Sequence, residues 1–194
     1  DAAYLSGLAE RIIREMRAKF PAVVYVTMNQ DLIEQIKRNL KDYDIGGVTF
    51  ATYSDLSSGK VETTPGQLLI LDEAHNIKNT ESARGKNGKK AVASAGFTVF
   101  ASATPYENPV QAEYLAPTGV FDEAGGHTEW AKIYGAAVRK WKDSEGTHEE
   151  VYWVSTKDST KDALQAKGWL ERKGVFTQRR IRLDPAMVQA RFRR

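Results

Sequence analysis

Two carboxylates and a histidine follow an apolar run in the segment LLILDEAHNIKN, residues 68–79. The run is typical of a buried strand, and Asp72, Glu73 and His75 come where that strand ends. In a parallel α/β sheet, ligands bind at the carboxyl ends of the strands. Two adjacent carboxylates there can divide the work, the first holding a hydrated Mg²⁺ and the second polarising an attacking water. The structural alternative is an acidic start to the next helix.

A second polar group ends another apolar strand in the segment FTVFASATP, residues 97–105. The hydroxyls of Ser102 and Thr104 can hydrogen-bond a neighbouring carboxylate or histidine. Either group alone is a weak signal, but the pair is much more specific. A structural role stays open for His75. The other two histidines, His127 and His148, stand in polar sequence and are predicted to be surface residues, since a metal site needs a third clustered ligand.

The elements that must position these residues alternate along the chain. Apolar spacings of three and four predict a helix over 3–19, and Asn29 can cap a second helix with a stripe from Leu32 to Leu40. The residues from 76 to 90 are predicted to form a loop that enters a helix near Ala91, because ARGKNGKK is rich in Gly and Lys. Short apolar runs predict parallel strands at 22–27, 48–54, 67–72 and 97–102.

The pattern changes after Pro117, and we place a boundary near residue 118. An amphipathic helix is predicted over 128–141, an isolated strand over 149–154 and a short helix over 163–170. The expected fold is therefore an α/β domain over 1–118, with a mainly parallel sheet between two layers of helices, and a mostly helical extension over 119–194.

Composition excludes several classes of protein. The 194 residues are 41% hydrophobic and 27% charged, with no cysteine, so disulfides and thiolate metal sites are excluded. No apolar run is long enough for a membrane span and no leader is recognisable, so we expect an intracellular protein, cytoplasmic or nuclear depending on its source.

The two motifs and their order resemble superfamily 2 helicases and translocases. VVYVTMNQDLIEQIKRNL is similar to their motif Ia, VTFATYSDL to motif Ib, DEAHNIKN to motif II and FASATPYENPVQAEYL to motif III. Within that superfamily the chain most resembles the strawberry notch and Swi/Snf-like group, including relatives on phage and mobile elements, and RKGVFTQRR resembles a later element. The resemblance covers residues 20–118 well and the remainder loosely.

The resemblance implies a RecA-like P-loop NTPase domain that uses ATP and Mg²⁺. It implies Asp72 as the Mg²⁺ ligand through water, Glu73 as the base, His75 as a coupler between nucleotide and nucleic acid, and Ser102 and Thr104 as the relay. It also implies backbone contacts to nucleic acid, DNA in preference to RNA, from Thr27, Asn29, Gln30 and Thr52. Arg179 and Arg180 of the basic tail are further candidates for such contacts.

One part of the family's site is missing from the sequence. No Gly-Lys-Thr or Gly-Lys-Ser loop is present, and we expect that loop just before Asp1 and a second RecA-like domain beyond Arg194. The chain is thus predicted to be a fragment of an ATP-dependent helicase or translocase that does not hydrolyse ATP measurably by itself. The alternatives are a non-catalytic nucleic-acid-binding scaffold and a restriction-type translocase subunit.

The residues from Lys167 to the end are strongly basic. They hold nine cations against Glu171 and Asp184, and they fit either a solvated face or a surface for phosphates. Trp130, Trp141 and Trp153 could join such a surface by stacking, although aromatic residues at this spacing more often fill a core.

Overall fold

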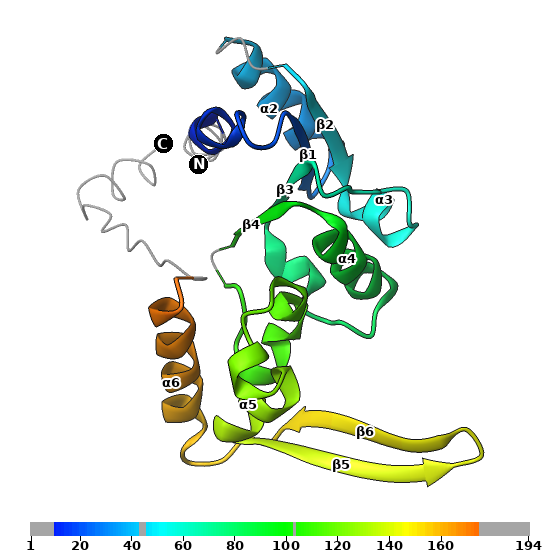
Figure 1. The fold of residues 1–194 in the computed structure, drawn as a ribbon, viewed down its shortest axis with the longest axis vertical. Coiled ribbons are helices and arrows are strands. Elements are labelled where there is room, and N and C mark those ends of the chain that lie inside the picture. The colour runs from blue at the N-terminus through cyan, green and yellow to red at the C-terminus, as the bar shows by residue number, and fades with distance from the viewer. Residues whose placement is uncertain (1–9, 43–45, 103, 175–194) are drawn as a thin grey trace, which may run out of the picture.

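A four-stranded parallel sheet forms the centre of the computed structural model, which describes residues 10–42, 46–102 and 104–174. The strand order is β2-β1-β3-β4, and β1 and β3 are the buried central strands (Figure 1). All neighbouring strands are parallel, so their carboxyl ends meet at one edge. The α/β fold predicted from the alternating pattern is confirmed. The strands are β1 Ala22–Thr27, β2 Val48–Thr52, β3 Gln67–Asp72 and β4 Phe97–Ala101.

Helices cover both faces of the sheet because side chains alternate between faces along each strand. On one face, Ile13 of the helical segment 10–16 and Ile36 of α2 (Gln30–Asp42) pack against Tyr25 and Ile70. The neighbouring strand residues, such as Leu69 and Leu71, face α3 (Tyr53–Ser57), η1 (Ala74–Ile77) and α4 (Ala83–Ser94). The sheet thus lies between two layers of helices.

Helix α4 corrects the predicted loop over 76–90. Its first residues, ARGKNG, contain two glycines that lower helix propensity but allow close packing. A Cβ at Gly85 would lie 2.0 Å from the carbonyl oxygen of Asn79, and one at Gly88 would lie 2.7 Å from Cγ2 of Ile77. The glycines therefore let α4 lie directly on η1, the turn that follows the predicted acidic site.

The region after residue 118 is less helical than predicted. The helix predicted over 128–141 is wrong in its second half, because Gly135 has φ +87° and ends α5. The following residues pair with the predicted strand near 149–154 in an antiparallel hairpin. The elements of this region are η2 Pro109–Thr118, η3 Asp122–Ala124, α5 His127–Ile133, β5 Ala136–Asp143, β6 Gly146–Trp153 and α6 Ser159–Arg172.

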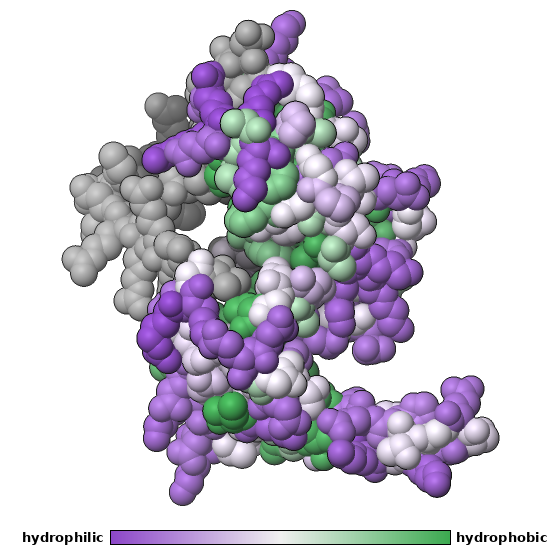
Figure 2. Space-filling model, viewed as in Figure 1, coloured by the Kyte–Doolittle hydropathy of each residue, from purple (hydrophilic) through white to green (hydrophobic). Residues whose placement is uncertain are grey.

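The β5–β6 hairpin projects from the end of the molecule opposite α2 (Figure 1). Its outer half is covered mainly by hydrophilic residues (Figure 2), and it carries the cross-strand ion pairs Arg139–Glu150 and Lys140–Glu149. Opposite charges on facing strands stabilise such a ribbon although it has little core of its own.

One apolar cluster includes residues from both sides of position 118. Leu69 and Leu71 of the sheet belong to the same cluster as Trp130 of α5 and Leu170 of α6, both of which are 0% exposed. Trp130 is thus a core residue. The boundary near 118 stays a prediction, since apolar contacts continue across it. Among the described residues, no helix is long and apolar enough to cross a membrane.

Candidate functional site

Asp72 lies at the carboxyl end of β3, where it is buried beside the side chains of Thr27 and Tyr25. The residue is 3% exposed, and Oγ1 of Thr27 at the end of β1 donates a hydrogen bond of 3.0 Å to Oδ2 of Asp72. Burial raises the pKa of the Asp72 carboxyl, and the hydrogen bond from Thr27 opposes that shift. Tyr25 is buried next to Asp72. Burial, and then the negative charge of Asp72, raise the pKa of the Tyr25 phenol.

Glu73 and His75 are brought together by an unusual backbone conformation. Glu73 is the only described non-glycine residue with positive φ, at φ 56° and ψ 51°. This left-handed residue turns the chain from β3 into η1, and the Oε2 atom of Glu73 lies 3.2 Å from Nδ1 of His75. A strained conformation that persists directly after a buried carboxylate is typical of functional sites.

Ser102, after β4, reaches the same histidine from the neighbouring strand. Its Oγ lies 3.1 Å from Nδ1 of His75 and accepts a hydrogen bond of 3.2 Å from the backbone N–H of Thr104. The structure therefore joins Glu73, His75, Ser102 and Thr104 in one chain of polar contacts at the carboxyl edge of the sheet. Thr104 contributes its backbone, and its residue is exposed.

The described residues predicted to touch nucleic acid lie at the same edge, and three of them have structural roles. Thr27 is 0% exposed and donates to Asp72, so its side chain is covered in this structure. Asn29 caps α2, as predicted, because its Oδ1 accepts from the N–H of Leu32 at 3.0 Å. Thr52 caps α3 in a reciprocal capping box with Asp55. Gln30 is exposed at the start of α2. Nucleic-acid contact by these residues stays a prediction, as it does for Arg179 and Arg180, which lie outside the described residues.

Arg84 is a central residue of the site that sequence reasoning missed. Its Nη1 donates to Oδ1 of Asn76 at 3.1 Å, and its Nε donates to Oγ of Ser57 at 3.3 Å. The Nδ2 of Asn76 in turn donates to the backbone oxygen of Glu73 at 2.8 Å and to Sδ of Met28 at 3.0 Å. Arg84 therefore connects the segments that follow β1, β2 and β3. Nothing in the local sequence distinguishes this arginine from a surface residue, because its segment is predicted to be a loop.

The guanidinium of Arg84 also lies over the ring of Tyr53, 5.6 Å from its centroid. Tyr53 is 1% exposed, and its hydroxyl has no hydrogen-bond partner among the described residues. Burial raises the pKa of the Tyr53 phenol, and the negative charges of Asp72 and Glu73 raise it further. This tyrosine is thus neutral and within electrostatic range of both carboxylates.

The remaining histidines differ from each other. His127 is buried, contrary to its predicted surface position, and its Nε2 lies 3.0 Å from the carbonyl oxygen of Pro109. Burial lowers the pKa of His127, so the ring is neutral and donates to that carbonyl. His148 stacks on Trp141 in the hairpin. Among the described residues, no group of three or more His, Asp or Glu side chains could hold a metal ion.

Comparisons with known proteins bear on the fold. No family model matches the chain, and no curated protein matches it. A solved structure with a similar fold is the SWI2/SNF2 ATPase core of Sulfolobus solfataricus in complex with dsDNA, at 17% identity and a TM-score of 0.53. The match covers 92% of this chain and 37% of that chain. The chain therefore has the fold of a RecA-like domain and spans little more than a third of the length of this neighbour.

Proposed function

We propose that the chain belongs to an ATP-dependent helicase or translocase, closest to the strawberry notch and Swi/Snf-like group, with residues 1–118 in its first RecA-like domain and 119–194 as an extension. The observation that carries the proposal is the contact of His75 with both Glu73 and Ser102, beside the buried Asp72. An acidic helix start would require neither a histidine between two strand ends nor a buried carboxylate.

The donor set fits a magnesium ion that keeps most of its water. Asp72 offers a buried carboxylate whose Oδ2 already accepts from Thr27, and Mg²⁺ is usually held in NTPases by one or two carboxylates together with waters and phosphates. Bound Mg²⁺ would neutralise charge on the transferred phosphoryl group. Asp72 would orient its hydration shell, and Glu73 would accept a hydrogen bond from the attacking water.

Hydrogen bonds connect the carboxylate site with the segments expected to contact nucleic acid. Thr27 touches Asp72 directly and is followed by Asn29 and Gln30, so the segment expected to meet a phosphate backbone begins at the metal ligand. Arg84 connects Asn76, after β3, with Ser57, after β2, by hydrogen bonds to both side chains. The dsDNA in the solved neighbour supports DNA as the nucleic acid.

Nucleic-acid-stimulated ATPase activity of the parent protein tests this function. We expect phosphate release to increase with single- or double-stranded DNA, and Glu73→Gln to lower turnover about 100-fold or more, as loss of a positioned base does. Glu81→Gln is the matched control, because Glu81 is an exposed carboxylate of the next loop. Turnover that survives Glu73→Gln would contradict the proposal, and DNA binding without any hydrolysis would support the non-catalytic scaffold instead.

A further inference from the structure

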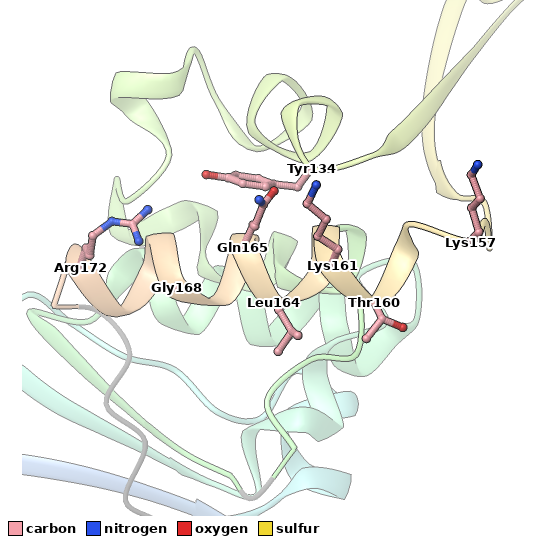
Figure 3. A pocket seen from close by; sticks show the side chains of 8 residues that line it. All are labelled: Tyr134, Lys157, Thr160, Lys161, Leu164, Gln165, Gly168 and Arg172. Atoms are coloured by element: carbon pink, nitrogen blue, oxygen red, sulfur yellow. The ribbon is translucent and has the colours of Figure 1, made fainter.

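A second surface with unassigned chemistry runs along α6, away from the carboxylates. An open groove of about 850 Å³ lies against this helix (Figure 3). Lys161, Gln165, Gly168 and Arg172 recur at intervals of three and four residues, so they share one face of α6, and Lys157 lies just before the helix. Thr160 and Leu164 also line the groove but point to the other side of the helix (Figure 3), so the cations occupy one side of it.

Each cation of this face has an acidic neighbour in sequence, Asp158, Asp162 or Glu171, but none of the three is held in an ion pair with it. None of Lys157, Lys161 and Arg172 forms an ion pair with another described residue, whereas Lys173 at the end of the same helix pairs with Glu123. At a rise of about 1.5 Å per residue, Lys161 and Arg172 lie about 16 Å apart along the axis. The acidic Asp162 lies beside Gly135, where its carboxylate would contact an added Cβ. The groove therefore presents spaced positive charge.

An aromatic ring lies among these cations. In the view of Figure 3 the ring of Tyr134 lies between Lys161 and Arg172, and Gln165 points toward it. The ring packs on the buried Trp130, with centroids 5.3 Å apart, so its position is supported by the core. A half-buried ring flanked by cations can stack on a base while the cations meet phosphates.

Gly168 is the observation that points to a ligand in this groove. Glycine inside a helix is unfavourable, and Gly85 and Gly88 in α4 are explained by atoms that leave no room for a Cβ. At Gly168 the nearest atom to an added Cβ is Nη1 of Arg172 at 3.5 Å, an ordinary contact. Only the end of the Arg172 side chain lies near this position, so the helix backbone at Gly168 is open to close approach by a ligand.

We infer that the cationic side of the α6 groove, formed by Tyr134, Lys157, Lys161, Gln165, Gly168 and Arg172, binds the phosphodiester backbone of a nucleic acid as a second contact surface. The choice of nucleic acid over an acidic peptide rests on the proposed function. The cations meet successive phosphates, Gln165 donates to a sugar or phosphate oxygen, and the backbone approaches the helix most closely at Gly168.

Charge removal tests the electrostatic part of this inference. Fluorescence anisotropy of the full 194-residue chain with a 20-base-pair DNA duplex is measured over a range of salt concentrations without nucleotide. Replacing Lys157, Lys161 and Arg172 by Gln is expected to weaken binding and to reduce the slope of log affinity against log salt by about 2.7, at about 0.9 per lost phosphate contact. The control replaces Lys41, Lys90 and Lys142 by Gln, which removes equal charge from exposed positions elsewhere.

Gly168→Ala tests the close approach, because its two effects have opposite signs. The melting temperature is expected to rise by about 2–4 °C, since alanine favours the helix, while affinity for the duplex falls several-fold. Unchanged affinity in both groove variants, or equal losses in groove and control variants, would overturn the inference. So would a poly-glutamate peptide whose binding depends on the groove when DNA binding does not. The ATPase test of Glu73→Gln is independent of these outcomes, so the proposed function can fail or stand separately.

Discussion

At the scale of single residues, the candidate site keeps a carboxylate where the fold alone would place an apolar group. Asp72 continues the buried face of β3 formed by residues such as Leu68 and Ile70. The hydrogen bond from Thr27, with smaller contributions from the backbone of Glu73 and the side chain of Tyr25, opposes the cost of taking its charge out of water, and burial is the larger effect on its pKa. The residue is thus better explained by chemistry than by stability.

Asp72→Asn is therefore expected to stabilise the chain at neutral and alkaline pH. A carboxyl group whose pKa is raised in the folded state destabilises the fold above that pKa, and this effect disappears as the pH falls through it. The amide can still accept the Thr27 hydrogen bond. Urea denaturation at pH 8 should give the variant the higher midpoint, and the difference should shrink toward pH 5. A wild-type chain that is the more stable at pH 8 would contradict this.

At the scale of elements, the main difference between the expected and observed folds comes from packing and strand-pairing contacts that local propensity does not include. Local propensity favours a loop at ARGKNG, because it does not include the packing of Gly85 on Asn79. In the same way, residues 136–141 have a helical apolar pattern but pair with β6, through contacts such as Trp141 with His148. Gly135 was the available signal for a helix end.

Gly85→Ala is expected to destabilise the chain by about 1–3 kcal/mol or more, because the added methyl group would overlap the backbone of Asn79 and push α4 away from η1. Gly168→Ala in α6 is the matched control, and it should be stabilising by about 1 kcal/mol. Urea denaturation measures both. If the two substitutions had the same sign, close packing would not be the reason for Gly85.

The polar connection between α4 and η1 makes a separate prediction. Arg84→Ala and Asn76→Ala each remove one partner of the 3.1 Å hydrogen bond, and the side chains also share neighbours. A double-mutant cycle by urea denaturation should therefore give an interaction energy of about 0.5–3 kcal/mol. Lys90→Ala, at an exposed position of the same helix, should be additive with Asn76→Ala. Additivity of Arg84 with Asn76 would mean that the arginine does not connect the segments.

At the scale of the whole molecule, the sequence predicts the structure best where a polar residue follows a buried apolar strand. The strands that carry Asp72 and Ser102 were predicted because buried parallel strands are continuous apolar runs, and parallel pairing then brings their ends together. Arg84 and Tyr53 could not be predicted, since their roles depend on the position of a helix with weak local signals. The organisation beyond residue 118 depends on which apolar residues share a core.

The shared apolar cluster predicts that the sheet and the region after residue 118 unfold together. Leu170→Ala in α6 removes a side chain that is 0% exposed and clusters with Leu69 and Leu71, so it should cost about 2–5 kcal/mol. Leu164→Ala is the matched control on the same helix, because Leu164 is 63% exposed and its loss should change stability little.

The deciding observation is which part of the chain loses free energy of unfolding in Leu170→Ala. All four tryptophans, Trp130, Trp141, Trp153 and Trp169, lie after residue 118, so their fluorescence reports on that region and on the part of the shared cluster that contains Trp130. Hydrogen exchange at the amides of Val24 and Leu69 follows the central strands. If one core joins both parts, the two probes should lose equal free energy of unfolding. A loss seen by fluorescence but not at the strand amides would instead mean that residues 119–174 unfold as a separate unit, as the predicted boundary implies.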